Sequence, residues 1–341
     1  MSRRRSIAGR IFVLIALIGL TAVVASRFTD FQKFIDMLRR GNWTWITAGM
    51  LIHVGYFIAY AHLYKRGFDV VDVSSKTMSL VPVVFAGIFV NAVIPSGGAG
   101  AAALFIDDAR RRGESGARAA VGVVLVLLTD LFTLLPFIAW GFAFLAMRHK
   151  VAGYDAISGV IFVAYIFMLV LFLSVAYRSE HRLTQFLEWV RRLVNRFKAG
   201  LISEAWPART SNEFCHAAHM LVQRPGKLTI LAGWGVIVHI INVTGLWALT
   251  RAFDVALPIS GIIAGFGIGI IFFIASPVPQ GVAVVEAVMT LVFTSLGMPE
   301  QKAITVALIF RGVNFWLPLV IGIWFLWRLR RFGERAVLEP A

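Results

Sequence analysis

Residues 259–296 read ISGIIAGFGIGIIFFIASPVPQGVAVVEAVMTLVFTSL, two short apolar arms on either side of the break Pro279-Gln280-Gly281. Proline cannot donate the helical hydrogen bond and its ring clashes with the preceding turn. A break of this kind survives at membrane depth only where protein or water satisfies the freed backbone groups. We therefore interpret the stretch as a broken hairpin that enters and leaves the membrane on one side. Two short full spans would give the same topology.

An earlier part of the chain repeats this arrangement. A second interrupted apolar stretch, about 78–106, is broken at Pro95-Ser96-Gly97-Gly98. The motif RGFDV at 66–70 returns as RAFDV at 251–255, an offset of 185 residues, and the offset at the breaks is 184. At the latter offset Gly113 also meets Gly297. The common order favours a duplicated unit, which is typical of a transporter rather than a soluble enzyme.

Composition places the whole chain in the membrane. Of its 341 residues, 59% are hydrophobic and only 15% are charged, whereas soluble domains have about 25% charged residues. The net charge of +15 is explained by topology and anionic lipid, because no basic-aromatic motif suggests nucleic acid. The single cysteine, Cys215, excludes an internal disulfide.

The predicted fold class is an all-α polytopic membrane protein, with six full spans and two oppositely oriented broken re-entrant hairpins. We expect one transmembrane domain over 1–341, in which an inverted repeat has one copy at about 43–146 and the other at about 228–327. A cytoplasmic amphipathic segment, about 178–227, separates the copies. A spanning helix needs roughly 20 apolar residues, and the predicted full spans are 11–26, 43–64, 119–146, 156–177, 228–250 and 303–327.

The distribution of basic residues sets the orientation. Arg3, Arg4 and Arg5 place the N-terminus in the cytoplasm, and the predicted cytoplasmic loops and tail carry more Lys and Arg than most outside loops. The loop at 27–42 is an exception. We expect both termini to be cytoplasmic in a bacterial inner membrane. Three crossings separate the copies of the repeat, so the second copy is inverted.

The long cytoplasmic loop contains a predicted helix at about 183–197. Its apolar residues follow helical spacing, and Arg182, Arg191, Arg192, Arg196 and Lys198 share the other side. Such a basic amphipathic helix suits anionic headgroups. Packing on the helix bundle is the equally weighted alternative.

Three charged residues inside apolar spans are candidates for function, because a charge in the membrane is costly. They are Asp130, Glu286 and Arg311. Arg311 and Glu286 either neutralise each other as a structural pair, or Arg311 anchors a passing phosphate through parallel hydrogen bonds. The Arg66–Asp69 and Arg251–Asp254 pairs are interpreted mainly as salt bridges at helix ends.

The breaks themselves are the second group of candidates, since helix N-termini bind anions through free backbone amides. A plain hairpin turn is the alternative for the glycines. The candidate substrate-binding residues are Asn91, Pro95, Ser96, Gly97, Gly98, Gly100, Asp130, Pro279, Gln280, Gly281, Glu286, Arg311 and Asn314. No motif indicates a metal, a cofactor or a catalytic nucleophile.

The sequence resembles the flippase-like family named after the transmembrane region of lysylphosphatidylglycerol synthase, from about Trp43 to Trp327. Two departures concern the headgroup: Gln280 precedes a single glycine where a double glycine is frequent, and 127–129 lack a frequent arginine. The family's two motifs fall on Asn91, Pro95, Gly97, Gly98, Gly100 and Asp130, and on Pro279, Gly281, Glu286, Gly297, Arg311 and Gly322.

This resemblance implies a flippase or scramblase that moves lipid between leaflets, without the aminoacyl-transferase domain of some members. Relatives are linked to aminoacylated lipids, hopanoids and polyprenyl-linked sugars, so the substrate stays open. We expect membrane lipids, foremost anionic phospholipid, as partners, with no nucleic acid, no cofactor and no enzymatic activity. The alternatives are a non-transporting partner that docks a lipid-modifying enzyme or glycosyltransferase, and an intramembrane enzyme using Asp130 and Glu286 as acid and base.

The inverted repeat predicts opposite sidedness at equivalent positions of its two copies. A cysteine introduced at Ser115 should react only with cytoplasmic thiol reagents, and one at Pro299 only with external reagents. Labelling in intact cells and in inverted vesicles measures this. Equal sidedness of the two positions would contradict the inverted repeat.

Overall fold

A computed structural model gives the structure of the chain. It describes residues 36, 38–93, 98–148, 160, 163–164, 167, 180–197, 203–276 and 279–338. Within these residues all regular secondary structure is helical. The predicted span at 11–26, nearly all of that at 156–177, and the break residues Pro95, Ser96 and Gly97 lie outside the described part.

Four described helical stretches are long and apolar enough to cross a membrane. Three are single helices: α3 (Trp43–Val70), α6 (Gly116–Met147) and α10 (Pro225–Arg251). The fourth, Glu300–Trp327, is built from α13 (Glu300–Arg311), the one-turn π-helix η2 (Gly312–Trp316) and the start of α14 (Leu317–Leu338). The protein is thus an all-helical membrane protein. Four of the six predicted spans correspond to these helices.

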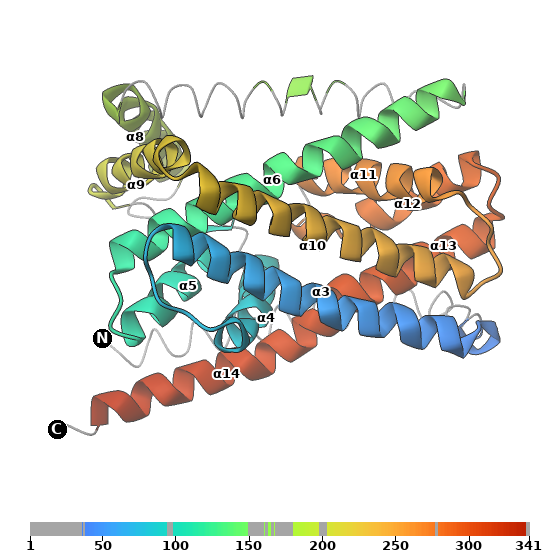
Figure 1. Cartoon of the computed structure of the whole chain (residues 1–341), viewed down its shortest axis with the longest axis horizontal. Coiled ribbons are helices and arrows are strands. Elements are labelled where there is room, and N and C mark those ends of the chain that lie inside the picture. The colour runs from blue at the N-terminus through green and yellow to red at the C-terminus, as the bar shows by residue number, and fades with distance from the viewer. Residues whose placement is uncertain are drawn as a thin grey trace.

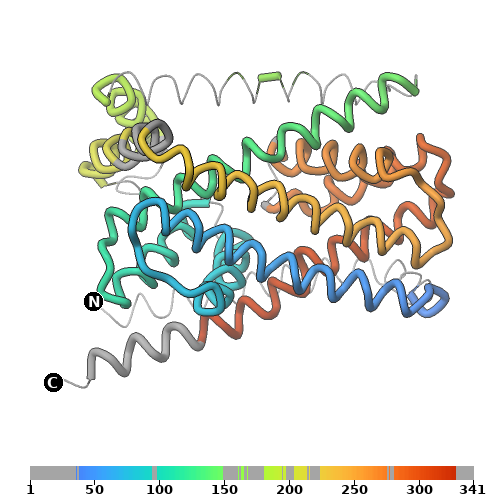
Figure 2. Tube along the Cα trace, in the orientation of Figure 1, coloured from blue at the N-terminus to red at the C-terminus, as the bar shows by residue number. Residues whose placement is uncertain are grey.

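Two pairs of shorter helices occupy the positions of the predicted broken hairpins. The first pair is α4 (Thr77–Val93) with α5 (Ala99–Arg111). The second is α11 (Ile259–Ala275) with α12 (Val284–Ser295), joined through the 3₁₀ turn η1 (Pro279–Gly281). Figure 1 shows the first pair at the left end of the bundle and the second at its right end. Helices α3 and α10 lie side by side and run in opposite directions between these ends (Figure 2).

The turn after the first helix of each half corrects the register of the repeat. After α3, the Val73 amide donates to the Phe68 carbonyl at 3.0 Å, and after α10 the Val255 amide donates to Thr250 at 3.3 Å. Asp72 and Asp254 take the left-handed conformation in these turns, with φ of 54° and 52°. The structural offset is therefore 182, and the 185-residue match of RGFDV with RAFDV was wrong by three residues. The equivalent residues are the aspartates that tolerate a positive φ in the turn, and not the residues of the longest sequence match.

The second corner confirms the 184-residue offset. Gly113 and Gly297 have φ of 80° and 94°, and each follows a helix as the left-handed residue of a Schellman-type end. The next amide closes the turn in both halves, from Glu114 to Ala109 and from Met298 to Phe293, each at 3.0 Å. The two halves therefore share both corners, with a two-residue difference in the segment between them.

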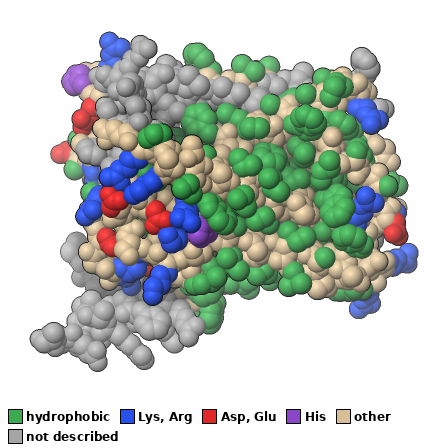
Figure 3. Space-filling view, viewed as in Figure 1, with side chains coloured by type: hydrophobic (Ala, Val, Ile, Leu, Met, Phe, Trp, Pro, Cys, Tyr) green, Lys and Arg blue, Asp and Glu red, His purple; other side chains and the backbone are tan. Residues whose placement is uncertain are grey.

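Apolar side chains cover the middle of the bundle, and charged side chains gather at its two ends (Figure 3). Leu51 and Val54 on α3, and Ile240 on α10, are at least half exposed. An exposed apolar belt between charged ends is the surface that a bilayer covers.

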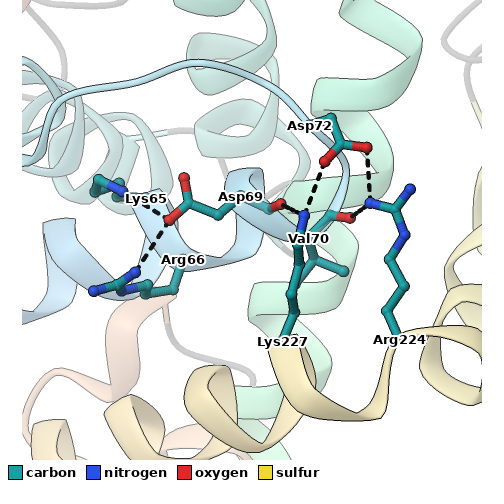
Figure 4. A network of polar contacts seen from close by, with 7 residues as sticks. All are labelled: Lys65, Arg66, Asp69, Val70, Asp72, Arg224 and Lys227. Carbon is teal, nitrogen blue, oxygen red and sulfur yellow. Dashed lines mark hydrogen bonds and ion pairs between the residues drawn. The ribbon is translucent and has the colours of Figure 1, made fainter.

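Figure 4 shows a polar network that joins the end of α3 to the start of α10. Arg224 and Lys227 bind the two oxygens of Asp72 at 2.8 and 2.9 Å, and Lys227 also donates to the Asp69 carbonyl at 2.7 Å. The hydrogen bonds from Lys227 and then Arg224 lower the pKa of Asp72 to about 2. Because this pKa is depressed, the contacts are fully formed above about pH 4 and would be lost only in strong acid.

Only one of the two predicted helix-end salt bridges is present. Asp69 accepts from Lys65 at 2.7 Å and from Arg66 at 3.4 Å. Arg251 instead lies over the Trp247 ring at 5.4 Å, and these described side chains include no Arg251–Asp254 ion pair. The prediction for the second pair was wrong, because Asp254 lies in the left-handed turn beyond the helix.

The predicted basic amphipathic helix is confirmed as α8 (Glu180–Phe197), which packs on α9 (Trp206–Gln223). Leu183 and Leu187 are buried, whereas Phe186 and Trp189 are at least half exposed. Part of the apolar face is therefore used for packing within the protein. Contact of the remaining part with headgroups stays a prediction.

Gly322 allows α14 to pass closely over α4. A Cβ at this position would lie 2.3 Å from the Phe85 carbonyl oxygen, which belongs to the backbone and cannot move aside. We expect Gly322→Ala to destabilise the protein by about 1–3 kcal/mol, because overpacking displaces the helices. Thermal unfolding in detergent measures this.

Gly233→Ala is the matched control, since a Cβ there meets nothing within 4 Å. It should melt at the wild-type temperature or slightly above, because alanine favours the helix. Equal melting temperatures of the two variants would show that α14 and α4 are not in close contact.

Candidate functional site

Arg311 is the last residue of α13 and lies in the middle of the apolar bundle with only 7% of its surface exposed. Its Nε donates to Glu286 Oε1 at 3.1 Å, and its Nη2 donates to the Gln280 carbonyl at 2.8 Å. The guanidinium also lies over the Phe315 ring, 4.6 Å from its centre. The ion pair that the sequence left open is thus present, and it is supported by a backbone carbonyl and an aromatic face.

The carbonyl that binds Arg311 belongs to Gln280 in the Pro-Gly break. Gln280, Gly281 and Ala283 have φ of 57°, 60° and 68°, so the chain is left-handed at three of four successive positions. A positive φ is unfavourable for residues with a Cβ and persists only where the surroundings enforce it. Gln280 therefore adopts a conformation that suits glycine, at the position where its carbonyl reaches Arg311.

Glu286 stands in the first turn of α12, where a carboxylate is favoured by the helix dipole. Its side chain is 12% exposed. Oε1 accepts from Arg311, but Oε2 is buried without a hydrogen-bond partner. A carboxylate oxygen accepts hydrogen bonds, so Oε2 can accept from a donor that reaches it.

The π-helix η2 follows Arg311 directly and carries Asn314. The Asn314 side-chain amide donates to Asn242 Oδ1 on α10 at 3.0 Å. π-helical turns are frequent at functional sites. The His53 ring on α3 meets the Phe310 ring of α13 edge-on, with 5.7 Å between the ring centres. Asn242 and His53 were missed in the sequence analysis, although polar residues within apolar spans were the available signal.

Asp130 on α6 has a different partner. His239 on α10 places Nε2 3.6 Å from Asp130 Oδ1 and 3.1 Å from the Asp130 carbonyl. Asp130 Oδ1 has no hydrogen-bond partner. The predicted trio of charges is therefore divided between two sites, with Arg311 and Glu286 in the second half and Asp130 in the first.

A cavity of about 110 Å³ lies between α3, α4, α5 and α6. Its wall is mainly aromatic and aliphatic, and Asn91 Oδ1 in that wall is buried without a partner. Gly98, with φ of 92°, opens α5 at the cavity. Gly100 follows within α5, while Pro95, Ser96 and Gly97 lie outside the described residues and the Pro279 side chain is not described. An apolar cavity with a few convergent polar groups is typical of a ligand site.

These features define the class of protein: an all-helical membrane protein with two interrupted helix pairs and a buried ion pair. Residues 7–322 match the family described as the lysylphosphatidylglycerol synthase TM region, and the chain belongs to this family. It is similar to a UPF0104 membrane protein of Methanocaldococcus jannaschii, with 20% identity over 316 residues and 92% of each chain covered. A UPF0104 membrane protein of Pyrococcus horikoshii is 20% identical over 340 residues, covering 91% of this chain and 94% of that one.

The buried pair predicts a difference between single and double substitutions. Glu286→Gln leaves the Arg311 charge uncompensated in the bundle, and breaking a buried pair in this way costs about 3–5 kcal/mol. The double variant Arg311→Met with Glu286→Met removes both charges and should unfold close to the wild-type midpoint. Unfolding of the detergent-purified variants compares them. A Glu286→Gln protein as stable as the wild type would show that the pair is solvated.

Proposed function

We propose that the chain is a membrane lipid transporter, a flippase or scramblase, that moves a lipid with an anionic or modified headgroup between leaflets. The headgroup enters between the two broken hairpins while the acyl chains stay in the bilayer. On this proposal the chain performs no chemistry on the lipid and uses no cofactor. Its partners are membrane lipids, foremost anionic phospholipid.

The observation that carries the proposal is a buried arginine held at a helix break. Arg311 is held by Glu286, by the Gln280 carbonyl and by the Phe315 ring. A phosphate suits the guanidinium because it accepts two parallel charge-assisted hydrogen bonds. When it binds, the phosphate takes the place of Glu286 on the guanidinium, and the freed carboxylate accepts from a hydroxyl or amine of the headgroup.

The membrane topology in this proposal follows the sequence analysis. The pairs α4–α5 and α11–α12 are re-entrant hairpins that approach the midplane from opposite sides, in an inverted repeat with six full spans. The end that carries Lys65, Arg66, Arg224 and Lys227 faces the cytoplasm, by the excess of basic residues. Both termini then lie in the cytoplasm, and the protein resides in a bacterial inner membrane. Inverted repeats with broken helices are the architecture of alternating access.

One observation favours a second candidate function. The exposed Phe186, Trp189 and Leu193 of α8 form a surface that α9 leaves uncovered. On this alternative the chain docks a cytoplasmic lipid-modifying enzyme or glycosyltransferase and moves no lipid. It gives no role to the buried Arg311–Glu286 pair, so transport is the better conclusion.

Reconstitution into liposomes tests transport directly. The wild type should move headgroup-labelled phosphatidylglycerol across the bilayer, and Arg311→Ala should slow this movement by about ten- to a hundredfold. That range corresponds to the roughly 1.5–3 kcal/mol of hydrogen bonds to charged groups. Accessibility of the label to a membrane-impermeant reductant gives the rate.

Arg148→Ala is the control, because Arg148 also lies over an aromatic ring, Phe144 at 5.4 Å, but caps the end of α6. It should transport at the wild-type rate. Movement that survives Arg311→Ala would remove the role of Arg311 and keep transport. Absence of movement for phosphatidylglycerol and for zwitterionic and glycosylated lipids would favour the docking function.

A further inference from the structure

The charge pair of the second half has no charged counterpart in the first half. With the 184-residue offset of the second corner, Arg311 corresponds to Leu127 and Glu286 to Ala102. Both of these first-half residues line the cavity. The cavity in the first half therefore occupies the place that the ion pair fills in the second half.

A second pair of equivalent contacts lies beside this place in both halves. Asp130 corresponds to Asn314 at the offset of 184, and Tyr60 corresponds to Asn242 at the offset of 182. Asn314 donates to Asn242 Oδ1 at 3.0 Å, and Tyr60 lines the cavity next to α6, the helix of Asp130. The second half thus has two neutral amides where the first half has a carboxylate and a phenol.

We propose that Asp130 with His239 forms a proton-binding site that couples proton movement to lipid movement. This inference rests on the proposed transport function. The pair differs from Arg311–Glu286 in one chemical respect: both of its members can titrate, whereas an arginine stays charged. One half then carries a fixed charge pair and the other carries a proton-dependent pair.

The described helices that pack on α6 are α3, α5, α9, α10 and α11, and α9 carries Arg209, which is exposed. Helix α11 packs on α6 without any titratable residue, and α10 brings His239. The carboxylates of α5, Asp107 and Asp108, are each paired with an arginine at the end of the bundle. Within the described part of the chain, no Lys or Arg pairs with Asp130. The titratable groups that α3 brings toward it are Tyr56, Tyr60 and Tyr64.

The cavity lies less than one helical turn along α6 from the position of Asp130. Val123 and Leu127 line the cavity, and Asp130 follows on the same face of α6 by helical spacing. About a quarter of the Asp130 side chain, 26%, is exposed, whereas His239 is 6% exposed. A cavity of about 110 Å³ with polar wall groups has room for several water molecules.

The proton step balances without any other reactant. In the deprotonated state the Asp130 carboxylate faces His239, whose Nε2 lies 3.1 Å from the Asp130 carbonyl. A hydronium ion in the cavity transfers its proton to the carboxylate, which becomes a carboxyl group and leaves water behind. Protonation at His239 Nδ1 would bind the same single proton. Release on the other side of the membrane restores the carboxylate.

Lipid distribution at steady state is the first test. A gradient of one pH unit across wild-type liposomes should distribute labelled phosphatidylglycerol about tenfold unequally between leaflets, if one proton accompanies each lipid. Asp130→Asn should distribute equally between the leaflets whatever lipid it moves. Asp254→Asn is the matched control and should keep the wild-type asymmetry, because asparagine tolerates the left-handed turn at that position.

Infrared difference spectra between acid and alkaline pH test proton binding without transport. The purified wild type should show a protonated-carboxyl band that Asp130→Asn lacks, that His239→Gln shifts and that Asp254→Asn retains. A band unchanged in Asp130→Asn, or equal leaflet distribution by a wild type that does move lipid, would overturn the proton site. A wild type that moves no lipid contradicts the transport proposal instead, and the infrared band then decides proton binding alone.

Discussion

A guanidinium and a carboxylate held away from water constrain the centre of this bundle. Charges in a low-dielectric interior are tolerated only when they are paired and hydrogen-bonded. Arg311 meets this requirement through Glu286, the Gln280 carbonyl and the Phe315 ring. The Pro-Gly break provides the carbonyl, the start of α12 provides the carboxylate, and η2 provides the ring. The break and the π-helical turn would each be costly alone, and together they place the groups that hold the Arg311 charge.

Much of the fold follows from the sequence. Apolar length predicted four spans that correspond to α3, α6, α10 and the α13–η2–α14 stretch, because a helix of about 20 apolar residues has few alternatives in a bilayer. The breaks at both hairpins follow from proline and glycine. The left-handed turn at Asp72 could not be predicted, since the RGFDV match one turn earlier was more conspicuous in the sequence.

The site could be predicted only where charge made it conspicuous. Arg311 and Glu286 stood out because the membrane is costly for charges. The contacts of His239 with Asp130 and of Asn242 with Asn314 join residues more than seventy positions apart. Helical periodicity gives the face on which a residue lies, but it does not give the helix that the face will meet. These polar pairs became visible only once α10 was placed against α6 and η2.

The two halves share their corners but not their chemistry. The second half fills the space beside its break with a charge pair, whereas the first half leaves a cavity beside Asp130. A duplicated bundle with identical sites would bind the same group twice. On our proposals, the half with the fixed charge pair holds an anion and the half with the titratable pair responds to protons.

The central claim is that the Arg311–Glu286 pair opens to admit a lipid phosphate. A structure of the protein in nanodiscs that contain anionic phospholipid would test this most directly. The account predicts a phosphate within hydrogen-bonding distance of the Arg311 guanidinium, with Glu286 displaced from its present 3.1 Å contact. An intact pair, with lipid phosphates found only at the two ends of the bundle, would contradict it.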